Sequence, residues 1–74
     1  MNLNGMGSVE WTDVRRRVVE IDGGYYLVDA AYLVRVPWRG PVTTEFLEVR
    51  RIQDGEGNDV EDDDIWESAV NKMR

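Results

Sequence analysis

Residues 25–36 alternate along the chain without interruption, and this pattern constrains the fold more than any other feature of the sequence. Successive side chains of a β-strand point to opposite faces of a sheet, so every second residue shares a face. One face is entirely apolar or aromatic and carries Tyr26, Val28, Ala30, Tyr32, Val34 and Val36. The other face is mixed and carries Tyr25, Leu27, Asp29, Ala31, Leu33 and Arg35. We therefore expect a strand with one buried face and one face that is half-solvated or forms an interface.

Residues 9–21 are consistent with two kinds of element. A helix would use Ser8 as its N-cap and present a stripe formed by Trp11, Val14 and Val18. A strand would suit the many β-branched residues, and Asp22-Gly23-Gly24 would form a hairpin turn into the next strand. We favour the strand and keep the helix as the alternative.

A turn and a further strand follow residue 36. Residues 37–41 contain two prolines, which cannot sit in a central strand, so this segment is predicted to turn. Residues 42–52 form the next predicted strand. Its alternation is imperfect because Phe46 and Leu47 would point in opposite directions, which indicates either a β-bulge or two partly covered faces.

The last predicted element is a helix. Residues 54–58 are rich in turn-forming residues, and Asp59 or Asp62 is the expected N-cap of the helix that follows. Helical spacing places five apolar residues on one face, namely Ile65, Trp66, Ala69, Val70 and Met73. Acidic residues in the first turn, and Lys72 and Arg74 in the last, match the helix dipole.

These elements predict an α+β domain with an antiparallel meander of three to four strands and a C-terminal helix across one face. Residues 1–8 are predicted to be a flexible tail, and residues 9–74 a single domain. Ile65 and Trp66 are expected to pack on the face that carries Tyr26 and Val28. Within these predicted elements, the opposite face has no cover.

The net charge of the chain is concentrated in its last 21 residues. From Met1 to Gln53, seven basic and seven acidic residues cancel, whereas from Asp54 to Arg74 eight acidic residues face only two basic ones. This split gives the net charge of −6 and separates a neutral, aromatic-rich body from an acidic segment. Together with the missing His and Cys, it predicts contact with another macromolecule rather than catalysis.

The absence of His and Cys limits the available chemistry. Disulfides, thiolate and imidazole metal ligands, and the side chain that titrates near neutral pH are all missing. Asp54, Glu56 and Asn58 begin like a calcium-binding loop, but Asp59 stands where Gly is required and Ile65 where Glu is required. We expect no enzyme activity, no catalytic residues, no cofactor and no specific metal site.

The arginines suggest a further hypothesis. Arginines from neighbouring strands, near Tyr25 on the uncovered face, would suit RNA or single-stranded DNA. In the alternative interpretation they pair with acidic residues of adjacent strands, namely Asp13, Glu20, Asp29, Glu45 and Glu48. Direct nucleic-acid binding is disfavoured because the body is neutral and the whole protein is acidic.

The acidic segment is the candidate partner-binding site. It contains Asp59, Glu61, Asp62, Asp63, Asp64 and Glu67, and an exposed Trp38 would add an aromatic anchor. An array of carboxylates can imitate the phosphates of nucleic acid and occupy a groove lined by Arg and Lys. The alternative is a solvated helix start that aids solubility, with Trp38 capping the end of the core.

The resulting hypothesis is a small acidic interaction module that inhibits a basic nucleic-acid-handling protein. Acidic inhibitors encoded by phages and mobile elements, anti-CRISPR proteins among them, are similar in composition, although no motif is shared. The alternative is a structural or assembly subunit that self-associates. A homodimer is compatible with every one of these hypotheses, and it is expected about as much as a monomer because a core this small commonly recruits a partner. No signal peptide and no membrane span are predicted, so we expect a protein of the bacterial or phage-infected cytoplasm.

Overall fold

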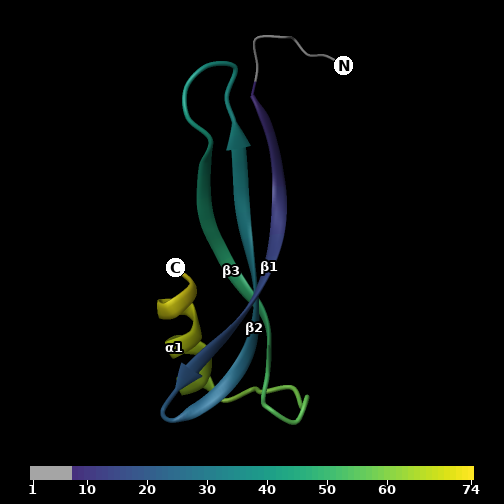
Figure 1. The fold of residues 1–74 in the computed structure, drawn as a ribbon, viewed down its shortest axis with the longest axis vertical. Helices are drawn as coiled ribbons and strands as arrows, with labels where there is room; N and C mark the ends of the chain where they lie inside the picture. The colour runs from purple at the N-terminus through teal and green to yellow at the C-terminus, as the bar shows by residue number, and fades with distance from the viewer. Residues whose placement is uncertain (1–7) are drawn as a thin grey trace.

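The computed structural model describes residues 8–74, and the predicted tail falls almost entirely outside them, over residues 1–7. The described chain forms strands β1 (Val9–Ile21), β2 (Gly24–Val36) and β3 (Thr43–Gln53), followed by helix α1 (Asp63–Met73). The strands make one antiparallel sheet in the order β1-β2-β3 (Figure 1). The predicted α+β meander with a C-terminal helix is confirmed, and it has three strands within residues 8–74.

Strands β1 and β2 form a long, regular hairpin. Their register runs without a break from Val9 opposite Val36 to Ile21 opposite Gly24. The two turn residues, Asp22 and Gly23, both have positive φ, at 51° and 83°, as a two-residue type I′ turn requires. The strand that we favoured for residues 9–21 is therefore the correct alternative.

Strand β3 pairs with β2 through two irregularities. The register shifts once between Asp29 and Ala30 and again between Ala31 and Tyr32. The bulge interpretation is therefore correct, and its effect is to place Phe46 directly opposite Tyr32 on one face. The two rings meet edge to face with their centroids 5.7 Å apart.

Helix α1 begins where its N-cap satisfies the free amides of the first turn. The Asp62 carboxylate accepts hydrogen bonds from the backbone N–H groups of Asp64 and Ile65, at 2.8 and 3.3 Å. Asp63 and Asp64 lie in the first turn and Lys72 in the last, as the helix dipole favours. Of the two expected caps, Asp62 is the one used.

The core lies between α1 and one sheet face, in the half of the sheet that ends at the β1–β2 turn. It comprises Val19, Ile21, Val28, Ala30, Tyr32, Val49, Ile52, Ala69 and Met73, and the predicted Ile65 and Trp66 pack against it. One hydrogen bond joins the end of the helix to the sheet, and a second joins its first part to the preceding segment. The Tyr32 hydroxyl donates to the Met73 carbonyl at 2.6 Å, and the Trp66 indole Nε1–H donates to the Val60 carbonyl at 2.7 Å.

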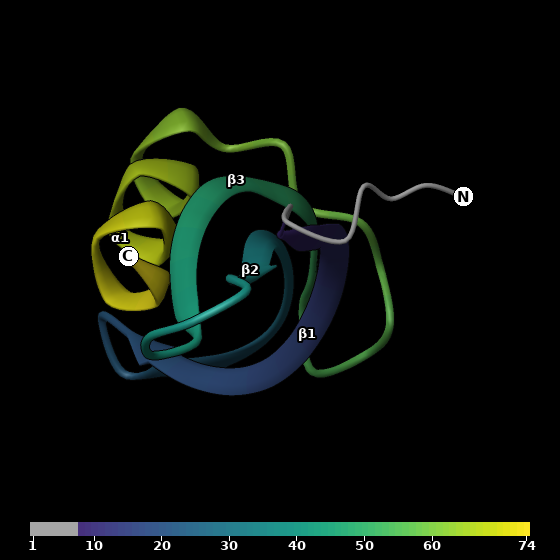
Figure 2. The same cartoon turned by 90° about the horizontal axis from the view of Figure 1, so that it is seen from above.

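The molecule is elongated because the sheet is much longer than its helix. It measures 48 × 20 × 17 Å, and its radius of gyration of 15.8 Å exceeds the ~11 Å of a compact domain this long. Figure 1 shows α1 beside the half of the sheet that ends at the β1–β2 turn, while the strands continue beyond it. Seen along the long axis, the strands curve around that axis with α1 on one side (Figure 2).

Candidate interaction surfaces

The acidic residues gather at the end of the molecule where α1 begins. We call the carboxylates between Asp54 and Glu67 the acidic end; this segment has eight carboxylates and no basic residue. Three of the eight have structural roles. Asp54 closes its loop, Asp59 forms an ion pair with Arg51 at 3.0 Å, and Asp62 is the N-cap of α1.

The role of Asp54 is to organise the loop between β3 and α1. Its carboxylate accepts hydrogen bonds from the backbone N–H groups of Asn58 and Glu56, at 3.0 and 2.9 Å. These bonds lower the pKa of Asp54, so the group stays ionised to a lower pH than a free Asp does. Gly57 adopts a φ of 85° in this loop, a conformation that glycine takes without strain.

The other five carboxylates remain exposed, and none has an ion-pair partner within residues 8–74; they are Glu56, Glu61, Asp63, Asp64 and Glu67. Four of them belong to the predicted site. The structure therefore brings the acidic part of that site together and divides it into structural and free carboxylates. The sequence alone did not show this division.

Trp38 lies apart from the acidic end. It is 64% exposed in the turn between β2 and β3, which Figure 1 places at the opposite end of the long axis. The hydrophobic cluster under α1 extends toward that end as far as Tyr32 and Phe46, and Val34 is buried beyond them. Trp38 and the acidic end could both touch one partner only if that partner spanned most of the molecule.

A second surface lies near Trp38, where the sheet extends beyond its helix. On this part of the sheet, register places six side chains on the same face that α1 covers nearer the β1–β2 turn. They are Val9, Trp11, Val34, Val36, Thr44 and Phe46. We call this set the bare face. Val9 is 63% exposed and Trp11 is 47% exposed, whereas Val34 between the outer strands is buried. Sequence reasoning missed this surface because it expected α1 to lie across one whole face and placed the uncovered surface on the opposite face.

Five of the six sheet arginines form ion pairs, and Arg17 is the exception within residues 8–74. Arg16 and Arg15 bond to Asp29 and Asp13, at 2.8 and 2.9 Å. Arg50 bonds to Glu48 at 3.0 Å and Arg35 bonds to Glu10. Only Arg16–Asp29 and Arg35–Glu10 join adjacent strands as the pairing interpretation expected. Arg15–Asp13 and Arg50–Glu48 each lie within one strand, and Arg51 bonds to Asp59 in the loop before α1. Of the five expected partners, Glu20 and Glu45 have no ion pair within residues 8–74.

Asp29 is the carboxylate most affected by this pairing. The hydrogen bond from Arg16 lowers its pKa, with smaller contributions from the charges of Arg16 and Arg51. Asp29 is thus a stronger acid than a free Asp, which is opposite to the shift that general acid catalysis at neutral pH requires.

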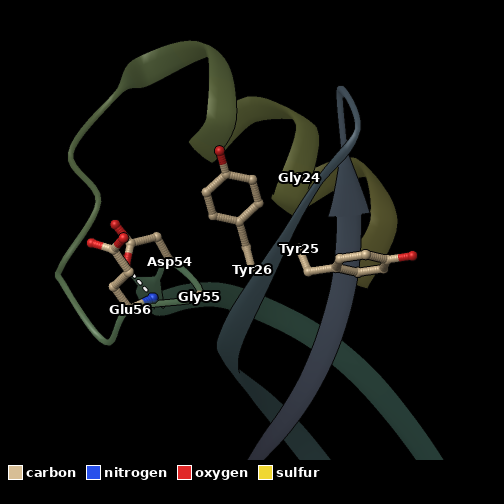
Figure 3. A pocket seen from close by; sticks show the side chains of 6 residues that line it. All are labelled: Gly24, Tyr25, Tyr26, Asp54, Gly55 and Glu56. Carbon is tan, nitrogen blue, oxygen red and sulfur yellow. Dashed lines mark hydrogen bonds between the residues drawn. The ribbon is translucent and has the colours of Figure 1, made fainter.

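One shallow hollow lies beside the acidic end. Its volume is about 460 Å³, and Gly24, Tyr25, Tyr26, Asp54, Gly55 and Glu56 line it. Figure 3 shows the Tyr26 ring pointing toward α1 and the Tyr25 ring pointing away from the hollow. The carboxylates of Asp54 and Glu56 lie on the other side of Tyr26 from Tyr25. The hollow is open to solvent, and no group of three metal-ligating side chains occurs within residues 8–74.

Comparison with protein-family models, with curated proteins and with solved structures finds no match to this chain. Within residues 8–74, α1 is the one helix, and its 11 residues fall short of the roughly 20 that cross a bilayer.

Proposed function

We propose that this protein is a non-catalytic interaction module that binds a protein with a basic surface through its acidic end. The observation that carries the proposal is the separation of charge along a long axis. The whole net charge of −6 arises in the segment from Asp54 onward, while the rest of the chain is neutral. The five free carboxylates of the acidic end are exposed where such a partner can reach them.

Physical arguments favour a basic partner of this kind. Electrostatic potential from a dense group of like charges speeds encounter with an oppositely charged surface. The screening length is about 8 Å at physiological salt, so the attraction acts at the acidic end and not along the whole 48 Å molecule. A groove that normally holds nucleic acid, lined by Arg and Lys, has the required chemistry. Inhibition of such a protein is the specific form of the proposal.

Direct binding of RNA or single-stranded DNA is a weaker candidate. Five sheet arginines are already bonded to carboxylates, so contact with phosphate would have to break these pairs. The tyrosines do not form a stacking platform beside them, because register places Tyr25 and Tyr26 on opposite faces. The third, Tyr32, is buried with the Arg15 guanidinium over its ring.

The test compares two variants that remove equal charge at different places. The first neutralises three free carboxylates of the acidic end, through Glu61→Gln, Asp63→Asn and Glu67→Gln. The control neutralises three exposed carboxylates of the neutral body that lie away from the β1–β2 turn, through Glu10→Gln, Glu45→Gln and Glu48→Gln. Asp62 is left intact, because its loss would remove the N-cap and weaken α1 itself.

Each tagged protein is used to capture partners from bacterial lysate at low salt, and the retained proteins are identified after a high-salt wash. The proposal predicts a basic nucleic-acid-handling protein that wild type and control retain, that salt releases, and that the acidic-end variant loses. The proposal would be contradicted if both variants retained the partner equally. It would also be contradicted if neither high salt nor the acidic-end substitutions released the partner.

A further inference from the structure

We propose that the bare face is the contact surface of a homodimer, in which the bare faces of two copies pack against each other. This inference is independent of the acidic end and of any basic partner. It rests on the missing second layer over half of the sheet, on the uncharged side chains of the bare face, and on the place of the net charge.

The first step concerns layers. A sheet face that is apolar must be covered by another element, and α1 provides this cover only as far as Tyr32, whose hydroxyl bonds to the last residue of the helix. An 11-residue helix is ~16 Å long, whereas a 13-residue strand extends over ~43 Å. The helix is thus too short to cover the sheet. Beyond Tyr32, no element within residues 8–74 lies over Val9 or Trp11.

The second step concerns charge. All six side chains of the bare face are uncharged, so a strongly charged partner has nothing to pair with there. The ionisable residues in the surrounding rows and turn nearly balance, with four acidic residues, Glu10, Asp13, Glu45 and Glu48, against three basic ones, Arg15, Arg35 and Arg39. The surface that fits is therefore another apolar face whose border has little net charge. A second copy of this chain presents such a face.

The third step is that dimerisation through this face avoids repulsion. Two molecules that each carry −6 repel each other if their acidic ends meet. The bare face lies at the other end of the 48 Å axis, far beyond the ~8 Å over which charges act in physiological salt. A two-fold axis through the paired bare faces places the same residues of both copies in contact, as most homodimers do.

The size of the surface sets the expected affinity. The bare face is three strands wide, at ~4.8 Å per strand, and about five residues long, at ~3.3 Å per residue, so it is a small patch. Trp11 and the nearby Trp38 add on the order of 250 Å² of exposed aromatic surface per copy. This total is at the low end for specific interfaces, so the dimer should dissociate in the micromolar range.

Two valines of β1 provide a matched test. Val9 on the bare face and Val18 on the opposite face are 63% and 65% exposed. Val9→Glu and Val18→Glu therefore add the same charge to the same strand at equal exposure. Sedimentation equilibrium from about 5 to about 500 µM would measure self-association, and far-UV circular dichroism would verify that each variant is folded.

The proposal predicts a wild-type dimer that Val9→Glu weakens by about tenfold or more and Val18→Glu by less than about twofold. Trp11→Ser should weaken it to a similar degree as Val9→Glu, without added charge. A wild-type monomer throughout this range would overturn the proposal. Equal weakening by both glutamate variants would also overturn it, since self-association would then not depend on the bare face.

Discussion

Replacement of Trp66 by alanine tests how α1 is held on the sheet. Trp66 lies half-buried against the core, and its indole Nε1–H donates to the Val60 carbonyl at 2.7 Å. Truncation of a fully buried Trp costs ~3–5 kcal/mol, and the partial exposure of Trp66 places its cost at the lower end, about 3 kcal/mol. About 1 kcal/mol of this is the lost hydrogen bond.

The assay is urea unfolding followed by far-UV circular dichroism. A domain of this length is expected to have ~4–11 kcal/mol of stability and a slope of about 1 kcal/mol per molar urea. Trp66→Ala should therefore lower the midpoint by about 3 M. Trp38→Ala is the matched control, and it should change the stability by less than ~0.5 kcal/mol because Trp38 lies 64% exposed in a turn. A loss below ~1 kcal/mol for Trp66→Ala would refute this arrangement of the helix.

Two further perturbations test the polar contacts of the fold. Tyr32→Phe removes the hydrogen bond to the Met73 carbonyl and should lower the free energy of unfolding by ~1–1.5 kcal/mol in the same urea assay, and an unchanged midpoint would contradict the contact. Lowered pKa values of Asp29 and Asp54 mean that both groups bind protons more readily in the unfolded chain than in the folded one. Their contribution is thus complete above the usual Asp value of 3.8 and is lost as pH falls through their lower folded values. Thermal unfolding should therefore show stability falling below pH ~4, and a fall already between pH 7 and 5 would contradict this assignment.

Much of the fold could be predicted because its signals are local. The alternation over residues 25–36, the Asp22-Gly23 turn and the helical spacing from Ile65 to Met73 each depend on neighbouring residues. The choice of strand for residues 9–21 was harder, since the stripe of Trp11, Val14 and Val18 fits a helix whereas the many β-branched residues fit a strand. The hairpin register decided it, and register depends on pairing with a distant segment.

The candidate site was predictable only in part. The sequence shows that the carboxylates cluster, but not that Asp54, Asp59 and Asp62 are engaged within the fold. The partner of Asp59 is Arg51, on the preceding strand, and that contact depends on how the intervening loop closes. The bare face was missed although element lengths contain the signal, because a helix of this length cannot cover strands of 13 residues.

The most direct measurement is amide hydrogen exchange along β2 at low micromolar concentration. If the sheet is stabilised mainly under α1, protection should be highest at Val28 and Ala30, which are fully buried in the core, and should decline toward Val34 and Val36. Raising the concentration into the dimer range should then slow exchange at the Val34 end and leave Val28 unchanged. Uniform protection along β2 at low concentration would contradict the division of this sheet into a covered half and a bare half.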